Sequence, residues 1–409
     1  MHILHLTRTT IEEAPGGLEY HVAYLTEALR QRGHQVEVMS LDSRDGQPPG
    51  EVRRPRSVRG KWTRLLQTRL GGWFSGVLDT ATTLLRRMHL DLQSNTAVAR
   101  VTQLDPDIIH QHTYLGALAL SWRLAKRYPI VFTNHTGAYI HLDRFWPTRR
   151  VQAWLLGLFD EIIAPSRELL PKTARSHYVP NGVDLKVFFP VDLHERARLR
   201  EELGCEDRTV FICPRRWAPT KGIIYLARAL NLLAPELLQR STFLFAGNET
   251  PGYGNYQGSV RAVLRTVPGA DVRILGNLDH ARVARLMNAS DACVIPSILE
   301  ATSLACLEAM ACGVPVLGTL TGGLPELIDQ GRNGWLVPPA DPVSLARALE
   351  LIIRSPGTRD AMRAAALDTI RGRYSWDLIA AQTEQIYQHV HLTARQGSRF
   401  DRTAVVASH

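Results

Sequence analysis

Short apolar runs alternate with longer amphipathic stretches along most of this chain. Each run has the length of a buried strand, and the stretches between the runs repeat apolar residues at helical spacing. Such alternation is typical of βαβ units, in which helices cover both faces of parallel sheets. The predicted strands are Ile3–Leu6, Val36–Met39, Ile108–Gln111, Ile130–Thr133 and Glu161–Ala164, then Thr209–Cys213, Phe243–Ala246, Val272–Leu275, Ala292–Ile295 and Val314–Leu317.

The pattern restarts near the middle of the chain, after a turn at residues 180–184. We therefore expect an α/β protein with two Rossmann-like domains, 1–188 and 189–372, facing each other across a cleft. A helix at 373–392 is expected to cross back to the N-terminal domain, and 393–409 to form a disordered tail. The other predicted helices are Leu18–Arg32, Gly222–Leu233, His280–Ala289, Ser303–Cys312 and Pro342–Arg354.

Composition narrows the class of protein. The chain has 409 residues, 45% of them hydrophobic, which suits two domains with full cores. It begins with no charged leader, and no apolar run is long enough to span a bilayer, so we expect a cytoplasmic protein. Five cysteines without a CxxC pair favour buried thiols over a zinc site. The net charge of +9 would attract phosphate, anionic lipid or nucleic acid, but no nucleic-acid module accompanies it.

The basic residues gather at 52–70 and 86–100. In the first cluster Trp62, Leu66 and Trp73 are mixed with arginines, a composition that could lie on an anionic membrane surface. An ordinary solvated helix packed on the sheet is the alternative. The stretch 52–100 therefore suggests peripheral contact with an anionic membrane, or a lipid-linked acceptor at the inner membrane face.

Candidate chemistry is expected after strands, because ligands of open α/β sheets bind at the carboxyl ends of the strands. The strongest group follows Ala292–Ile295: Glu300 lies in the loop, and Thr302 or Ser303 can cap the next helix. Free N–H groups and the dipole at that helix start favour an anion. Glu308 lies nearly two turns into the helix and could accept hydrogen bonds from sugar hydroxyls, although alone it would be a solvated surface charge.

A second, basic group follows the strand Thr209–Cys213 and contains Arg215, Arg216 and Lys221. These cations could neutralise a departing diphosphate near the helix start at Thr302. A basic surface turn is the alternative.

Two further positions follow strands in the first half. Gly16-Gly17 could let the backbone approach a ligand at a helix start, or could form only a turn. His135, two residues after Ile130–Thr133, could bond a sugar hydroxyl or serve a structural role.

Two patterns have the spacing of metal motifs. His110 and His112 flank one residue at a strand end, but no third ligand lies nearby in the sequence, so metal binding is the weaker interpretation. Asp105-Pro106-Asp107 matches a DxD pattern, but Pro106 favours a turn that leads into the strand. We expect no metal ion and no other cofactor.

Taken together, these residues resemble the retaining glycosyltransferases of the GT-B group often called family 4, over roughly residues 1–392. The block Glu300-x7-Glu308 is the most specific part of the match. The remaining matching segments are Gly16-Gly17, Gly33–Val36, Pro106–His110, Pro180–Asp184, Arg216 with Lys221-Gly222, Gly247, Ala309–Ala311, Gly313, Pro315, Gly322-Gly323 with Glu326, and Asn333-Gly334.

The resemblance implies roles for these residues. Glu308 would accept from the nucleotide ribose, and Arg216 and Lys221 would bind the diphosphate. Arg215 stands where many members have glycine, so the two arginines could exchange roles. Glu300 would hold the donor sugar, with the backbone that follows it at Ala301, Thr302, Ser303 and Leu304.

The family pattern also places Gly247 beside the donor, lets Gly16-Gly17 close over it, and gives His135 a contact with its sugar. The implied reaction moves a sugar from a nucleotide sugar to a hydroxyl of a glycan, lipid-linked or small-molecule acceptor in polysaccharide biosynthesis. Anomeric configuration would be retained, without a metal ion, and the leaving phosphate would take the acceptor proton. A sugar-nucleotide 2-epimerase and a non-catalytic partner in a polysaccharide-assembly complex are the alternatives.

Overall fold

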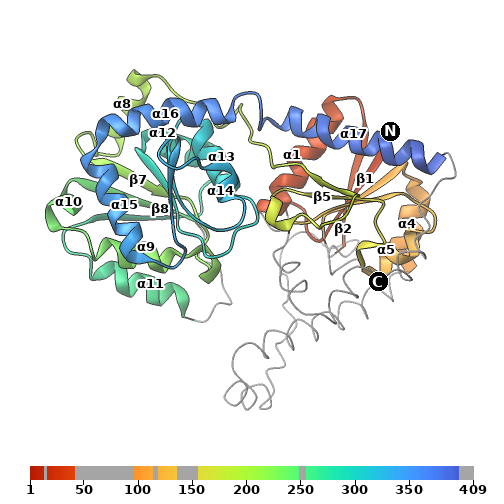
Figure 1. Ribbon diagram of the computed structural model, residues 1–409, viewed down its shortest axis with the longest axis horizontal. Helices are drawn as coiled ribbons and strands as arrows, with labels where there is room; N and C mark the ends of the chain where they lie inside the picture. Colours follow the sequence, from red (N-terminus) through yellow and green to blue (C-terminus); the bar gives the residue numbers. More distant parts are fainter. Residues whose placement is uncertain (13–15, 42–94, 114–117, 136–154, 248–254, 396–409) are drawn as a thin grey trace, which may run out of the picture. The chain divides into compact units, whose positions relative to one another are not determined.

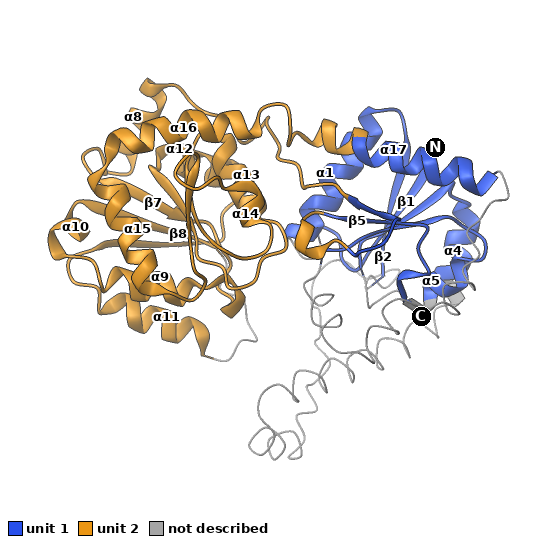
Figure 2. Ribbon diagram, in the orientation of Figure 1, with its two compact units in different colours: residues 1–164, 171–177, 382–409 blue, residues 165–170, 178–381 orange. Residues whose placement is uncertain are grey.

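The computed structural model describes residues 1–12, 16–41, 95–113, 118–135, 155–247 and 255–395. The chain divides into two compact units, shown in different colours in Figure 2. The first unit comprises residues 1–164, 171–177 and 382–409, and the second comprises residues 165–170 and 178–381. Among the described residues each unit is built on one six-stranded sheet, so the predicted α/β class is confirmed.

The first sheet has the strand order β2-β1-β3-β4-β5-β6, with parallel pairing from β2 through β5. β1 lies between β2 and β3, so the strand order reverses there. Its strands are β1 (His2–Thr7), β2 (Gln35–Ser40), β3 (Ile108–Gln111), β4 (Ile130–Thr133), β5 (Glu161–Ala164) and β6 (Ser176–Tyr178). The described helices around it are α1 (Gly17–Gln31), α4 (Asn95–Leu104) and α5 (Leu118–Leu124).

The second sheet is parallel and has the order β12-β11-β10-β7-β8-β9, which is the strand order of a Rossmann fold. Its strands are β7 (Thr209–Cys213), β8 (Ser241–Ala246), β9 (Asp271–Gly276), β10 (Ala292–Ile295), β11 (Val316–Thr319) and β12 (Gly334–Val337). Its helices are α8 (Leu193–Glu202), α9 (Ile223–Leu230), α10 (Pro235–Gln239), α11 (Tyr256–Arg265), α12 (His280–Ala289), α13 (Leu304–Ala311), α14 (Leu324–Leu327), α15 (Pro342–Arg354) and α16 (Pro356–Ile370).

Helices cover both faces of this second sheet (Figure 1). The pleat of β7 shows why its sequence is apolar throughout. Phe211 and Cys213 enter the core that α9, α11 and α15 build, whereas Val210 and Ile212 enter the core that α12 and α13 build. A strand covered on both faces needs apolar residues on both, and this explains the unbroken apolar run Val210–Cys213.

Most predicted strands and helices are found within one or two residues of their predicted bounds. The helix predicted at Gly222–Leu233 ends earlier, at Leu230, and α8, α11 and α16 were not among the predicted helices. The strand predicted at Val314–Leu317 lies at Val316–Thr319, because Gly313 has a φ of 71° and Pro315 lacks a backbone donor. The short strands β6 and β12 were not predicted. The last helix, α17 (Trp376–Arg395), continues beyond its predicted end, and the boundary between the two units falls inside it.

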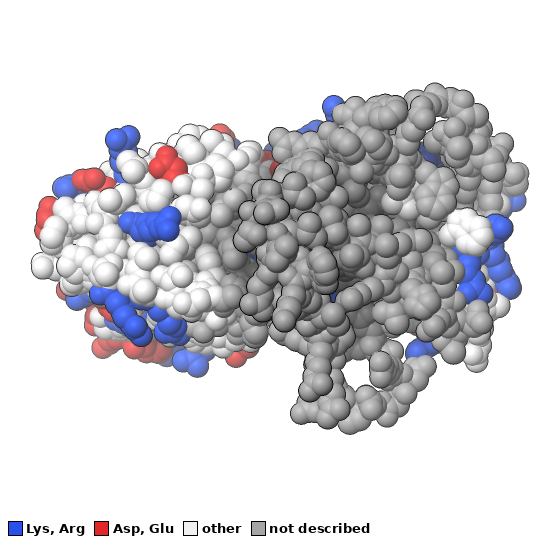
Figure 3. Space-filling model, turned by 90° about the horizontal axis from the view of Figure 1, so that it is seen from below, with Lys and Arg blue, Asp and Glu red and all other residues white. Residues whose placement is uncertain are grey.

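The basic segments, the surface charges, the apolar content of the helices and the cysteines bear on the remaining predictions. The basic segments at 52–70 and most of 86–100 lie outside the described residues, so the predicted membrane contact is not described by the structure. In Figure 3, charged side chains of both signs are scattered around the edge of the second unit, at the left of the view. Within the described parts of the chain, no helix combines the length and the apolar content required to cross a membrane. All five cysteines are buried free thiols, as predicted.

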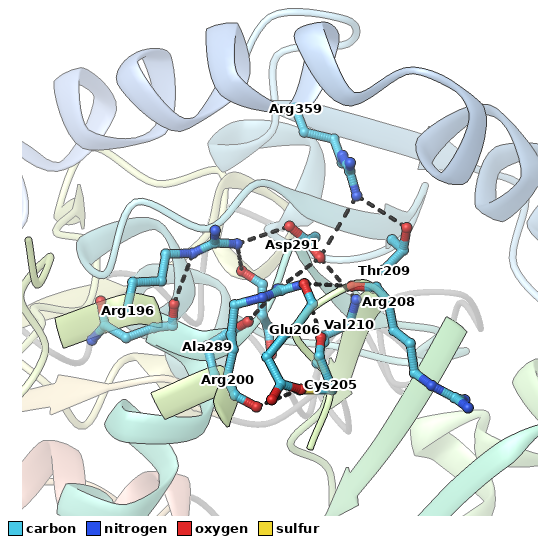
Figure 4. A network of polar contacts seen from close by, with 12 residues as sticks. Arg196, Arg200, Cys205, Glu206, Arg208, Thr209, Val210, Ala289, Asp291 and Arg359 are labelled. Carbon is cyan, nitrogen blue, oxygen red and sulfur yellow. Dashed lines mark hydrogen bonds and ion pairs between the residues drawn. The ribbon is translucent and has the colours of Figure 1, made fainter. Parts of the chain in front are cut away.

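A partly buried carboxylate ties several elements of the second unit together (Figure 4). Asp291, directly before β10, accepts from the backbone N–H of Val210 at 2.8 Å. Its oxygens also pair with Arg196 at 2.8 Å, Arg200 at 3.1 Å and Arg359 at 3.6 Å. Burial alone would raise the pKa of Asp291, but the arginines, Arg200 foremost, hold it below its ordinary value. One acid therefore links α8, β7, β10 and α16.

We expect Asp291→Asn to lower the free energy of unfolding by about 3–5 kcal/mol, because it leaves buried arginines without their counter-charge. Asp329→Asn is the matched control, since Asp329 pairs with Arg332 on an exposed surface, and should cost less than about 1 kcal/mol. Urea unfolding at pH 7 measures both. Because the pKa of Asp291 is lowered, its contribution is present above the unfolded-state pKa and disappears as pH falls through the folded-state pKa. A loss equal to that of the control would contradict this role.

Candidate functional site

The loops after β7 and β10 meet because these strands are neighbours in the second sheet. Phe211 pairs with Ala292 and Ile212 with Cys293, in parallel. The strand order reverses between β7 and β10, and an open sheet forms a crevice at the carboxyl edge of such a point. Thr220, in the first loop, accepts hydrogen bonds from the backbone N–H groups of Ile298 and Leu299 at 2.8 and 3.2 Å. The predicted basic group after β7 and the predicted group around Glu300 after β10 therefore lie next to each other.

A buried carboxylate, Glu300, lies at the centre of this site. Arg215 donates to it through Nη2, and Lys221 Nζ lies 3.1 Å from each of its oxygens. Ser297 donates to the same carboxylate at 3.0 Å. Arg215 also reaches the hydroxyls of Ser297 and Ser303, both at 3.4 Å. The structure thus brings together four predicted residues, Glu300, Arg215, Lys221 and Ser303, and one, Ser297, that the sequence did not single out.

The ionisation of these groups follows from burial and from one another. Burial alone would raise the pKa of Glu300, but Arg215 first and Lys221 next hold it below its ordinary value, so it is ionised. Burial lowers the pKa of Lys221 to about 8, Arg215 and Arg216 act in the same direction, and Glu300 opposes them. Lys221 is therefore a cation at neutral pH that loses its proton under mildly alkaline conditions.

The start of α13 adds backbone donors next to these charges. Ser303 is the N-cap, and its hydroxyl accepts from the N–H of Cys306 at 3.3 Å. Thr302, the other predicted cap, instead donates to the carbonyl of Pro165 at 2.6 Å. Ala301 and Leu304, on either side, are partly exposed. The first N–H groups of a helix carry a partial positive charge, so this end of α13 favours an anion.

Two glycines allow neighbouring loops to lie against the backbone of Arg215 and of Glu300. A Cβ on Gly247, directly after β8, would lie 2.0 Å from the carbonyl oxygen of Arg215. Gly322 has a φ of 56°, and a Cβ there would lie 1.7 Å from the carbonyl oxygen of Glu300. Any side chain at position 247 would therefore collide with the backbone of Arg215. Gly322, which belongs to the family resemblance but not to the predicted site, lies directly against the Glu300 loop.

Glu308 differs from Glu300 in the direction in which its surroundings shift its pKa. It lies in α13 and is partly exposed, whereas most of the helix around it is buried. Burial raises its pKa to about 7, and Arg215 opposes that rise. Such a carboxyl group changes its ionisation near neutral pH, which a solvated surface glutamate would not do.

The two arginines of the β7 loop lie in different surroundings. Arg215 is buried against Glu300, whereas Arg216 is exposed. Arg216 is nevertheless near enough for its charge to lower the pKa of Lys221. The sequence could not distinguish the two residues, and the structure gives Arg215 the contact with the carboxylate.

In the first unit, Gly16 is the N-cap of α1 and Gly17 is its first residue. His135 lies after β4 and is partly exposed, and its Nε2 shares a hydrogen bond with His112 Nδ1 at 3.2 Å. Burial, together with the charge of His21, lowers the pKa of His135 well below its ordinary value. His135 is therefore neutral at physiological pH.

His110 has a structural role in the first unit. Its Nδ1 lies 2.5 Å from the hydroxyl of Tyr387 in α17, and its Nε2 lies 2.6 Å from the hydroxyl of Thr133. Tyr387 also contacts His5 Nε2 at 3.4 Å. These bonds, with the pair of Glu384 and Arg32 at 2.7 Å, attach the second half of α17 to the first unit.

The two sequence patterns with the spacing of metal motifs, Asp105–Asp107 and His110 with His112, differ in the structure. Asp107 accepts from the backbone N–H of His2 at 2.8 Å and donates its own N–H to the His2 carbonyl, as a turn leading into a strand requires. Around His112, however, the structure gathers ring nitrogens that the sequence does not place together. Two sets of three histidines have ligand atoms within 4.8 Å of one another: His5, His110 and His112, and His21, His112 and His135.

Two family models match the chain, and together they cover most of it. The second half, residues 195–369, matches "Glycosyl transferases group 1", and residues 15–187 match "Glycosyltransferase Family 4". The boundary between the two matches falls within the second compact unit, shortly before α8.

Curated relatives match over most of the length of both chains. One is a D-inositol 3-phosphate glycosyltransferase of Xylanimonas cellulosilytica, 29% identical over 406 residues and 91% of each chain. Another, from Kribbella flavida and of the same name, is 31% identical over 308 residues, which cover 69% of this chain and 71% of that protein.

Solved structures match the fold. Sucrose-phosphate synthase from Thermosynechococcus elongatus has a TM-score of 0.73 and 22% identity, covering 96% of this chain and 99% of that one. Anabaena HepE, in complex with UDP and glucose, has a TM-score of 0.69 and 21% identity, covering 94% and 98%. The matched models, the relatives and the two parallel sheets together show that this chain belongs to the group 1, family 4 glycosyltransferases and has their GT-B fold.

Proposed function

We propose that this glycosyltransferase takes its sugar from a nucleoside diphosphate sugar, retains the anomeric configuration and needs no metal ion. The observation that carries the proposal is the buried Glu300 carboxylate between Arg215 and Lys221 at the start of α13. Of the similar structures, HepE is a complex with UDP and glucose, which supports a donor of this class.

The charge balance of the site suits a diphosphate. Arg215, Arg216 and Lys221 supply three cations, and Glu300 supplies one ionised carboxylate, so two positive charges remain (3 − 1 = 2). The backbone donors of α13 add a partial positive charge. A nucleotide sugar carries two negative charges on its diphosphate, which this surplus would balance without a divalent cation.

Each residue then has a defined task. Lys221 moves from Glu300 to the diphosphate, whereas Arg215 stays paired with Glu300 and fixes the direction of the carboxylate. Glu300 accepts from the donor sugar, with the backbone of 301–304 beside it. Arg216, which is exposed, meets the outer phosphate oxygens. Glu308 accepts from the ribose hydroxyls.

The reaction is a displacement at the anomeric carbon. The acceptor oxygen forms the new glycosidic bond on the face from which the nucleoside diphosphate leaves, and the departing phosphate oxygen takes the acceptor proton. Lys221, Arg216 and the α13 donors stabilise the charge that develops on the leaving group. Contacts from His135 to the donor sugar and from Gly16-Gly17 over the donor belong to the same proposal and rest on the family resemblance.

The acceptor is a hydroxyl compound whose identity the site does not define. The relatives are named for D-inositol 3-phosphate, so a phosphorylated polyol belongs in an acceptor panel with glycans and lipid-linked sugars. The basic stretch 52–100 supports an anionic acceptor or an anionic lipid surface at the cytoplasmic face. Flotation with anionic liposomes at low salt tests the lipid surface, and protein left in the bottom fraction would remove it.

Thermal-shift measurements with UDP-, GDP-, ADP- and dTDP-sugars in EDTA test the donor class. A ligand at a hundred times its dissociation constant stabilises by about 2.7 kcal/mol, which shifts the melting temperature measurably. We expect one nucleotide to produce this shift. Conversion of that donor to an epimer without acceptor would show a 2-epimerase, and binding without turnover over the acceptor panel would show a non-catalytic partner.

Lys221→Ala should lower turnover by about 10²–10³, because the variant loses one donor to the leaving diphosphate. Initial rates at saturating donor measure the effect, with melting temperature as the check on folding. Lys172→Ala, an exposed lysine in the first unit, is the control and should leave the rate unchanged. Turnover of Lys221→Ala near that of the wild type would refute the assignment.

Donor affinity should depend on pH as a bell. Affinity rises as pH increases through about 7, because Glu308 becomes an ionised acceptor, and falls as pH passes about 8, because Lys221 loses its charge. Titration calorimetry between pH 6 and 9 measures both limbs. Glu308→Gln should remove the acid limb, and Lys221→Arg should remove the alkaline limb. Unchanged limbs in these variants would assign the titrations to other groups.

A further inference from the structure

We propose that the first unit binds a divalent transition-metal ion of the Zn²⁺ class through His21, His112 and His135. The ion is not a cofactor of the proposed transfer; it is an inhibitory ligand. The binding step rests on the geometry of the first unit and is independent of the proposed function. Only the inhibition rests on that function.

The sheet order brings these histidines together. His112 follows β3 and His135 follows β4, and these strands are parallel neighbours, so their carboxyl ends lie side by side. His21 lies in the first part of α1, which follows β1, the neighbour of β3 on its other side. The ring centroids of His21 and His135 are 4.5 Å apart, and those of His112 and His135 are 5.4 Å apart.

Geometry and chemistry favour an ion at this place. The three ligand atoms lie within 4.8 Å of one another. Tetrahedral zinc with bonds of about 2.0–2.1 Å needs nitrogen pairs about 3.3 Å apart, so small rotations of the rings complete the site. Imidazole ligands suit zinc, copper, nickel and cobalt, whereas magnesium and calcium prefer oxygen.

The alternative set of His5, His110 and His112 is less suitable. Both nitrogens of His110 are engaged by hydroxyls, those of Tyr387 and Thr133, at 2.5 and 2.6 Å. His5 Nδ1 lies 2.9 Å from the hydroxyl of Thr26 in α1. An ion there would have to displace bonds that attach α17 to the sheet.

His112 is the decisive ligand. Its side chain is buried, with 1% exposure, and its Nε2 has no hydrogen-bond partner among the residues that the structure describes. A buried ring nitrogen without a partner is costly in an interior, and a metal ion would satisfy it. The ring is neutral, since burial and the neighbouring histidines lower its pKa well below the ordinary value. Neutral imidazole is the form that ligates metals.

Binding changes one hydrogen bond. While His112 Nδ1 and His135 Nε2 share a proton, only one of the two rings has an outward lone pair. The ion therefore replaces this bond: His135 turns toward the metal, and His21, His112 and His135 each give one nitrogen lone pair. The imidazole N–H groups are kept, and a water molecule completes the tetrahedron. Because His135 is then committed to the metal, it is withdrawn from the donor sugar.

Cobalt titration of tag-free, EDTA-treated and buffer-exchanged protein tests the site. We expect a visible d–d absorption typical of tetrahedral Co²⁺ that saturates at one equivalent and disappears when Zn²⁺ is added. His112→Gln should weaken Co²⁺ binding at least about tenfold, and His135→Gln should do the same. His280→Gln, on α12 in the second unit, is the matched control and should bind as the wild type does.

Circular dichroism and UDP binding, measured on each variant, separate loss of the site from loss of the fold. If His112→Gln does not fold, His135→Gln decides, because His135 is partly exposed. Absence of the cobalt band in the wild type, or an equal band in both folded variants, would overturn the site. Turnover of EDTA-treated, buffer-exchanged protein that falls on addition of stoichiometric Zn²⁺, but not in His112→Gln, is the expected inhibition. Failure of donor binding in EDTA would instead count against the proposed function.

Discussion

An ionised carboxylate that is removed from water needs positive charges and hydrogen-bond donors around it. At Glu300 this need determines how the neighbouring loops of the second unit are arranged. Arg215, Lys221 and Ser297 supply the compensation from three directions. To reach the carboxylate, the loops after β7 and β10 must come within contact of each other. Gly222, at the end of the loop after β7, makes this approach sterically possible, because a Cβ there would lie 1.8 Å from the carbonyl oxygen of Pro296. Arg215 and Lys221 are thus held together beside the start of α13.

Strand order explains why these loops are neighbours although some eighty residues separate them in the sequence. In the second sheet β7 lies next to β10, so the residues that follow both strands share one edge. The same reasoning applies to the first sheet, where β1, β3 and β4 bring histidines from distant segments together. There His110 attaches α17 to the sheet through Tyr387. His112 has a buried ring nitrogen, Nε2, without a hydrogen-bond partner among the described residues.

Much of this arrangement could be predicted from the sequence, because buried parallel strands are apolar and polar residues follow their carboxyl ends. The order of the segments was sufficient to expect that Glu300 and the basic residues after β7 lie close together. Sequence could not choose between Arg215 and Arg216, since the alternation of the strand ends at Cys213, nor between Thr302 and Ser303 as the cap. Sequence did not group the histidines around His112, because His21 and His135 are close to it only in space. The three- and four-residue strands β6 and β12 are too short to show a period.

The most direct test of the central claim is ³¹P NMR of UDP, GDP and ADP added to the protein in EDTA. If Arg216, Lys221 and the start of α13 bind a diphosphate without a metal ion, one nucleotide should show shifted and broadened phosphate resonances, and Lys221→Ala should largely restore those of the free nucleotide. Resonances unchanged with all three nucleotides, or changed only when Mg²⁺ is added, would contradict the account.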